Sequence, residues 1–170
     1  MPVRLGERPV TTGADAARVG DLMLALGLDS GGPLHIITVP GAPHSKSRPR
    51  FSRHGGRAYH DPKDKVAEQS TAVYLKATVR QQFTSNVALA CLFFRPDRQR
   101  IDADNLLQHV CDAANGILWV DDCQCTAIAG VIEYDKAEPR TVVAVAPHTS
   151  TLLRDLSTPT KPKGGLPLWD

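Results

Sequence analysis

The chain has 170 residues, of which 42% are hydrophobic and 22% are charged, and its formal net charge is +2. This length and composition are typical of one globular domain and exclude a disordered or collagen-like chain. No apolar run approaches the roughly 20 residues that cross a bilayer, and the N-terminus lacks a secretory signal. We therefore expect a cytoplasmic protein with no membrane segment, whose four cysteines are reduced thiols.

The N-terminal half alternates helix, strand and helix. Apolar residues spaced three and four apart predict a helix from about residue 14 to Gly27. The β-branched run over residues 34–39 predicts a buried strand. Residues 62–83 contain no further Pro or Gly after Pro62 and predict a long helix, with four residues on one helical face: Val66, Ser70, Val73 and Ala77.

The C-terminal half begins with a second apolar strand over residues 86–94, followed by a helix from residue 104 that ends at Asn115-Gly116. Residues 123–134 and 141–145 read as strands separated by a short charged turn, which suggests a hairpin. The order of elements predicts an α+β fold in which helices pack on a small mixed or antiparallel sheet.

These elements divide the chain into three parts. Residues 1–33 form an N-terminal helical extension, residues 34–147 form the folded domain, and residues 148–170 form a tail rich in Thr, Pro, Lys and Gly. We expect this tail to be flexible.

Positive charge is concentrated between residues 41 and 60, a segment without any Asp or Glu. Its basic residues are Lys46, Arg48, Arg50, Arg53 and Arg57. Because Ser, Pro and Gly are interleaved with them, we favour contact with DNA phosphates over a merely solvated loop. Phe51 and Tyr59 of the same segment are expected to be core or strand residues rather than to stack on bases.

Acidic residues gather further along the chain. Asp102 and Asp104 lie where a predicted strand leads into a helix, and in extended backbone they would point the same way. Asp121 and Asp122 follow after the chain has turned back. Neighbouring carboxylates repel, and a bound Mg²⁺ or Mn²⁺ would relieve this repulsion and support phosphodiester hydrolysis. The alternative is a helix N-cap and a solvated turn.

Other polar residues favour structural roles. Cys123 and Cys125, with a histidine and a cysteine nearby, lack the two-residue gaps of common zinc knuckles, so zinc is not expected. Asp112 is expected to form a structural ion pair. Trp119 is most simply an anchor in the core or in a dimer interface.

Four motifs occur in order along the chain. Residues 41–50 read Gly-Ala-Pro-His-Ser-Lys-Ser-Arg-Pro-Arg, residues 100–106 read Arg-Ile-Asp-Ala-Asp-Asn-Leu, residues 112–116 read Asp-Ala-Ala-Asn-Gly, and residues 119–124 read Trp-Val-Asp-Asp-Cys-Gln. They resemble the Gly-x-Pro-x-x-Lys-x-Arg-Pro-Arg, Asp-x-Asp-Asn-Leu, Asp-Ala-x-Asn-Gly and Asp-Asp-x-Gln motifs of the RusA-type Holliday-junction resolvases. The resemblance covers roughly residues 36–145.

This resemblance implies a homodimeric α+β endonuclease of phage or prophage origin, which nicks four-way DNA junctions symmetrically with Mg²⁺ or Mn²⁺ in recombination and repair. A two-fold dimer would supply the two symmetric nicks. By position, the catalytic metal ligands would be Asp102, Asp104 and Asp122. The candidate DNA-binding residues are Lys46, Arg48, Arg50, Arg53 and Arg100. Two alternatives are a branched-DNA-binding protein that cleaves weakly or not at all, and a flap or fork nuclease of the same fold.

The chain departs from the family pattern at Gln108, where the family usually carries a lysine. Residue 108 lies four residues after Asp104 and on the same helical face, where an ammonium could stabilise negative charge on the phosphate. Glutamine cannot supply that charge. Either the activity is weakened, or Arg100, Lys46 or Arg48 takes over, or the protein only binds DNA.

Overall fold

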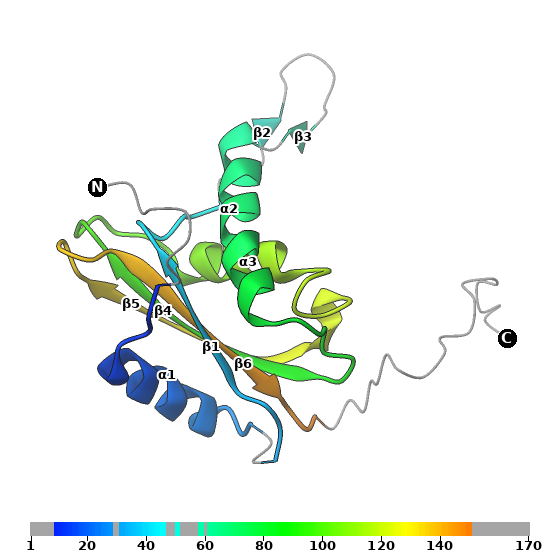
Figure 1. The fold of residues 1–170 in the computed structure, drawn as a ribbon. Coiled ribbons are helices and arrows are strands. Elements are labelled where there is room, and N and C mark those ends of the chain that lie inside the picture. The colour runs from blue at the N-terminus through cyan, green and yellow to red at the C-terminus, as the bar shows by residue number, and fades with distance from the viewer. Residues whose placement is uncertain (1–8, 29–30, 47–49, 52–57, 60, 151–170) are drawn as a thin grey trace, which may run out of the picture.

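The computed structural model describes residues 9–28, 31–46, 50–51, 58–59 and 61–150. In chain order its elements are α1 (Gly13–Ala25), β1 (His35–Pro40), β2 (Arg50–Phe51), β3 (Ala58–Tyr59), α2 (Pro62–Thr78), β4 (Val87–Arg95), α3 (Ala103–Ala114), the 3-10 turn η1 (Asp122–Gln124), β5 (Cys125–Tyr134) and β6 (Arg140–Pro147). The helices pack on a mixed sheet, which confirms the predicted α+β class (Figure 1). No helix of the described ranges is long and apolar enough to cross a bilayer.

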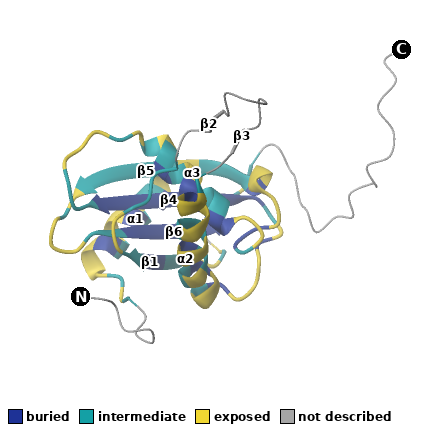
Figure 2. Ribbon diagram, turned by 90° about the horizontal axis from the view of Figure 1, so that it is seen from above, coloured by how far each residue is buried: buried dark blue, intermediate teal, exposed yellow. Residues whose placement is uncertain are grey.

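The main sheet has the strand order β1-β6-β4-β5, and β2 and β3 form a separate small ribbon. β4 pairs in parallel with β5 and antiparallel with β6, so α3 is the crossover that joins two parallel strands. The burial of the strands follows from this order: β4 and β6 lie inside the sheet and are buried on both faces, whereas β5 is an edge strand (Figure 2).

The predicted hairpin of the last two strands is wrong, because β4 lies between β5 and β6. The α3 crossover returns the chain to one side of β4, and β6 then fills the other side. Six consecutive residues of β6 are buried, as an interior strand requires. The short turn before Arg140 therefore bridges across β4 instead of joining neighbouring strands.

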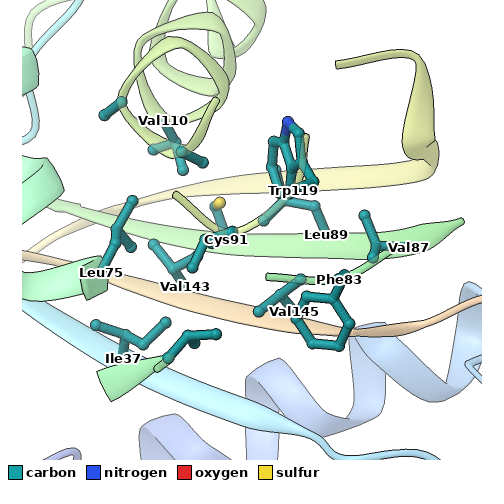
Figure 3. Packing of buried hydrophobic residues seen from close by; sticks show 14 of the residues in the cluster. Ile37, Leu75, Phe83, Val87, Leu89, Cys91, Val110, Trp119, Val143 and Val145 are labelled. Atoms are coloured by element: carbon teal, nitrogen blue, oxygen red, sulfur yellow. The ribbon is translucent and has the colours of Figure 1, made fainter. Parts of the chain in front are cut away.

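Helices cover both faces of the sheet. On one face, Leu75 of α2 and Val110 of α3 pack with Leu89, Val143 and other buried residues of the strands (Figure 3). On the opposite face, α1 contributes Val19 and Met23 to a second cluster that contains these sheet residues: Ala88, Ala90, Leu92, Phe94, Val142, Ala144 and Ala146. The N-terminal helix is therefore part of the core of this domain.

The predicted helix over residues 62–83 is shorter than expected and ends at Thr78. Its apolar spacing identified the helix, but Val66 and Val73 on the face that carries that spacing are 66% and 63% exposed. The buried residues of α2 are Asp64, Thr71 and Leu75. A polar residue can be buried when a hydrogen-bond partner lies beside it. The spacing of apolar residues therefore does not reveal which face of α2 is buried.

Candidate active site

Asp102 and Asp104 lie together at the N-terminal end of α3. Asp102 is the N-cap residue, with extended backbone, but its side chain makes no capping hydrogen bond. Asp104 lies in the first turn, where its Oδ1 accepts a hydrogen bond from the backbone N–H of Asn105 at 2.9 Å. Both residues are exposed, and the positive end of the helix dipole faces them. The two carboxylates are therefore accessible to a cation or to DNA.

Asp122 lies in η1, immediately before β5. Its Oδ1 accepts a hydrogen bond from Nε1 of Trp119 at 2.9 Å. The expectation of a core anchor at Trp119 is confirmed, because its side chain is fully buried. Asp121 has a different role: it is the N-cap of η1 and forms a capping box with Gln124. The indole thus fixes the orientation of the Asp122 carboxylate, while Asp121 holds the turn.

The three candidate acids are divided between two ends of α3. Asp102 and Asp104 follow the C-terminal end of β4, whereas Asp122 precedes the N-terminal end of β5, which runs parallel to β4. The 12 residues of α3 span about 18 Å. The structure therefore brings Asp102 and Asp104 together but leaves Asp122 far from them. Among the residues described, no group of three or more His, Cys, Asp or Glu side chains could hold a metal ion.

Lys46 lies between α2 and α3. Its ammonium forms an ion pair with Asp112 and lies 3.9 Å from Oε1 of Glu68, and its backbone N–H donates to the carbonyl of Asn105 at 3.3 Å. The structural ion pair expected of Asp112 is confirmed. Because the Lys46 side chain is only 16% exposed, its ammonium is held by protein carboxylates rather than presented to solvent.

The other candidate DNA-binding residues are described less fully. Arg48, Arg53 and Arg57 lie outside the described residues. The backbone of Arg50 belongs to β2 and pairs with Tyr59 of β3. Arg100 is exposed and lies two residues before Asp102 in the chain. Gln108, the departure from the resembled motif, is exposed one turn further along α3.

Polar side chains of α2 and α3 hold His44, near the start of the basic segment (residues 41–60), between these two helices. Nε2 of His44 lies 2.7 Å from Oδ1 of the buried Asp64, and the rings of His44 and His109 lie 4.9 Å apart. Nε2 of His109 in turn contacts Oγ1 of Thr71 at 3.0 Å. Burial lowers the pKa of His109 to about 4, so its ring is neutral near pH 7.

Sequence reasoning missed this histidine network. The usable signal was the position of Asp64 and Thr71, which share a helical face with Leu75. Polar residues in line with a buried leucine indicate buried hydrogen bonds.

The four cysteines all lie within the described residues, and none of them forms a disulfide there. Cys111, in the last turn of α3, and Cys125, at the start of β5, are within hydrogen-bonding reach of each other. This contact lowers the pKa of Cys111. Both thiols pack against the core on the side of the sheet covered by α3.

Comparison with known proteins identifies the class. A family model described as Endodeoxyribonuclease RusA matches residues 40–146, which is more than half of the chain. The search of individual curated proteins found no match to this chain. The matched region includes both ends of α3 and all three candidate acids, but not α1. The chain belongs to the RusA family of endodeoxyribonucleases, and a nuclease activity on DNA is the activity of that family.

Proposed function

We propose that this protein is a metal-dependent endonuclease that resolves four-way DNA junctions by symmetric nicking, as a homodimer, in the cytoplasm of a bacterial or phage-infected cell. The observation that carries the proposal is the pair of exposed carboxylates, Asp102 and Asp104, at the start of α3 within the region matched by the family. Because both side chains are exposed at a helix N-terminus, a cation can reach them, and that cation would in turn bind a DNA phosphate.

The donor set fits a hard divalent cation. Asp102 and Asp104 offer only oxygen atoms, which suits Mg²⁺, with Mn²⁺ as a substitute. When bound, the cation would supply positive charge to the phosphoryl oxygens and lower the pKa of a bound water. The chain's own residues would hold the cation, and Arg100 would neutralise an adjacent phosphate.

The position of Asp122 supports the homodimer. Because Asp122 lies at the other end of α3 from Asp102 and Asp104, the three carboxylates cannot surround one cation within a single chain. A two-fold axis that places α3 of two copies antiparallel would bring Asp122 of each copy to the acidic pair of the other. Such a dimer has two equivalent centres, which symmetric nicking needs.

The basic segment is proposed to follow the junction arms. Arg48, Arg50 and Arg53 would contact phosphates, and Lys46 would hold the base of the segment against α2 and α3. Each phosphate neutralised releases counterions, so binding should weaken steeply as salt is raised.

The test is cleavage of a labelled four-way junction beside a matched linear duplex, in Mg²⁺ and in EDTA. Wild type should nick the junction in pairs in Mg²⁺ only, and Asp104→Asn should reduce the rate by at least about 100-fold, because a ligand to the cation is lost. Asp21→Asn, at an exposed position of α1, is the matched control and should cut normally. Undiminished nicking by Asp104→Asn would overturn this assignment of the site.

A second candidate is a branched-DNA-binding protein that cleaves weakly or not at all, and the observation that favours it is the exposed Gln108. If Gln108→Lys cleaves the junction and wild type does not, while both bind it with equal affinity, the wild-type protein is a branched-DNA-binding protein. Flap and fork substrates in the same assay would separate the proposed function from that of a flap or fork nuclease.

A further inference from the structure

An exposed aromatic ring ends the edge strand. Tyr134 is the last residue of β5 and is 46% exposed. The guanidinium of Arg98, from the segment that follows β4, lies over this ring, 4.3 Å from its centroid. The two strands end side by side, because Tyr134 is paired with Arg95 in the parallel ladder. A flat cationic and aromatic surface is thus formed by two segments that are distant in sequence.

This surface lies on the same face of the sheet as α3. Side chains of a strand alternate between faces, so Gly130, Ile132 and Tyr134 share one face. Leu107 of α3 covers Gly130, and Ile132 packs against the core cluster beneath α2 and α3. Glu133, on the opposite face, pairs with Arg18 of α1 as this alternation requires.

The surface also lies at the end of the sheet where α3 begins. β4 and β5 run parallel, and the chain passes from the end of β4 directly to α3. Tyr134 is therefore at the same end and on the same face as Asp102 and Asp104, whereas Asp122 is at the other end. Arg98 and Arg100 are both exposed and belong to the segment that leads from the end of β4 to the acidic pair, so they add positive charge to this end of the sheet.

We propose that Tyr134 and Arg98 form a stacking surface for an unpaired nucleobase of branched DNA, beside the phosphate that a cation at Asp102 and Asp104 would bind. This inference rests on the proposed function and adds the means by which the site distinguishes a branch point from a linear duplex. Bases at a branch point can leave their stack, and an aromatic ring or a guanidinium offers them a face without regard to sequence. A linear duplex offers the same phosphates but no free base.

The charges and the ring favour DNA over an apolar partner. A tyrosine whose ring lies under an exposed guanidinium presents a polar, cationic surface, whereas a protein-docking patch is typically depleted of charge at its centre. Arg95, at the end of β4, is ion-paired with Asp97, which anchors the turn that carries Arg98.

The experiment measures DNA binding in EDTA, so that cleavage is not needed. A four-way junction and a matched linear duplex each carry 2-aminopurine, at the branch point or at the equivalent duplex position. The variants are Tyr134→Ala, Tyr134→Phe and, as the matched control, Ile128→Ala. Ile128 lies on the same edge strand and the same face, and it is 45% exposed.

Tyr134→Ala should weaken junction binding by about 5- to 150-fold, which is the range measured for one base stacked on an aromatic side chain. It should also abolish the change in 2-aminopurine fluorescence, while duplex affinity stays that of wild type. Tyr134→Phe keeps the ring and should behave as wild type, as should Ile128→Ala.

Two results would overturn the proposal. The first is wild-type junction affinity and fluorescence in Tyr134→Ala. The second is an equal loss of junction and duplex binding, which would reveal a purely structural role for the ring. Failure of the proposed function would look different, because wild type would then bind the junction in EDTA but leave it uncut in Mg²⁺.

Discussion

Lys46 forms an ion pair with Asp112, and this pair joins the segment after β1 to the last turn of α3. Replacing Lys46 with Met would leave Asp112 and Glu68 facing each other without a cation in a half-buried groove. We expect a loss of about 1 to 3 kcal/mol in the free energy of unfolding, measured by urea denaturation.

The double variant Lys46→Met, Asp112→Leu should recover part of this loss, since no carboxylate is then left unpaired at residue 112. Lys65→Met, at an exposed position of α2 beside the same groove, is the control and should be nearly neutral. Wild-type stability in Lys46→Met would show that the pair contributes nothing.

The pKa of His109 makes stability depend on pH. Its folded-state pKa is about 4, against 6.5 for an unperturbed histidine. Below pH 6.5 the unfolded chain binds a proton at His109 that the folded chain does not bind until about pH 4. Stability from this residue is therefore complete above pH 6.5 and falls by about 2 to 3 kcal/mol between pH 7 and pH 4.5. Unfolding curves of His109→Gln should lack this component. If the two proteins lose stability in parallel, the ring is not held neutral.

Gln124 satisfies four backbone groups from a fully buried position. Its Nε2 donates to two carbonyls, at 2.9 and 2.8 Å, and its Oε1 accepts from two N–H groups, at 2.8 and 3.0 Å; the partners are Phe83, Ser85, Val120 and Asp121. Gln124→Leu should destabilise the fold by about 2 to 4 kcal/mol, because these groups lose their partners. Thermal and urea unfolding would measure this change, and a variant as stable as wild type would disprove the role assigned here.

The separation of the acids along α3 predicts complementation between inactive variants. If each centre combines Asp102 and Asp104 of one copy with Asp122 of the other, a mixed dimer of Asp104→Asn and Asp122→Asn contains one complete centre. Each variant alone should be inactive, whereas mixed dimers, purified through a different tag on each copy, should nick one strand of a junction. A mixed dimer as inactive as its parents would argue for a centre built within one chain.

Much of the local structure was predictable from the sequence. The helix expected from residue 104 to Asn115-Gly116 is α3, Ala103–Ala114, and Gly116 has the positive φ of 74° that its place after the helix requires. The apolar strand over residues 86–94 is β4 within one residue at each end. These predictions succeeded because apolar period and stop signals are local properties of the chain.

The partners of the elements could not be predicted in the same way. A charged turn between two strands is compatible with a hairpin and equally with a connection across a third strand, and only the position of β4 decides between them. The buried face of α2 depends on the partners that His44 and His109 provide. Both features arise from residues far apart in sequence, and local patterns do not report them.

In the candidate site, too, the local structure was predictable from the sequence, whereas the distance between segments was not. The sequence placed Asp102 and Asp104 at the start of a helix, and the structure has both there, although only Asp102 has the extended backbone that the spacing argument assumed. The distance to Asp122 depends on the direction in which α3 and β5 run, so sequence spacing alone was compatible with a close cluster that the single chain does not form.

The folding unit of this protein is larger than the unit that sequence comparison recognises. The family match begins at residue 40, yet α1 supplies Val19 and Met23 to the core and Asp15 to a bidentate pair with Arg140 at the start of β6. A chain trimmed to the matched region would present the α1-facing Ala, Leu, Phe and Val side chains of the sheet to water. Arg140 would lose its bidentate partner Asp15 and keep only Asp135. Such a trimmed protein should self-associate during refolding, and its failure to cut DNA would then say nothing about the nuclease centre.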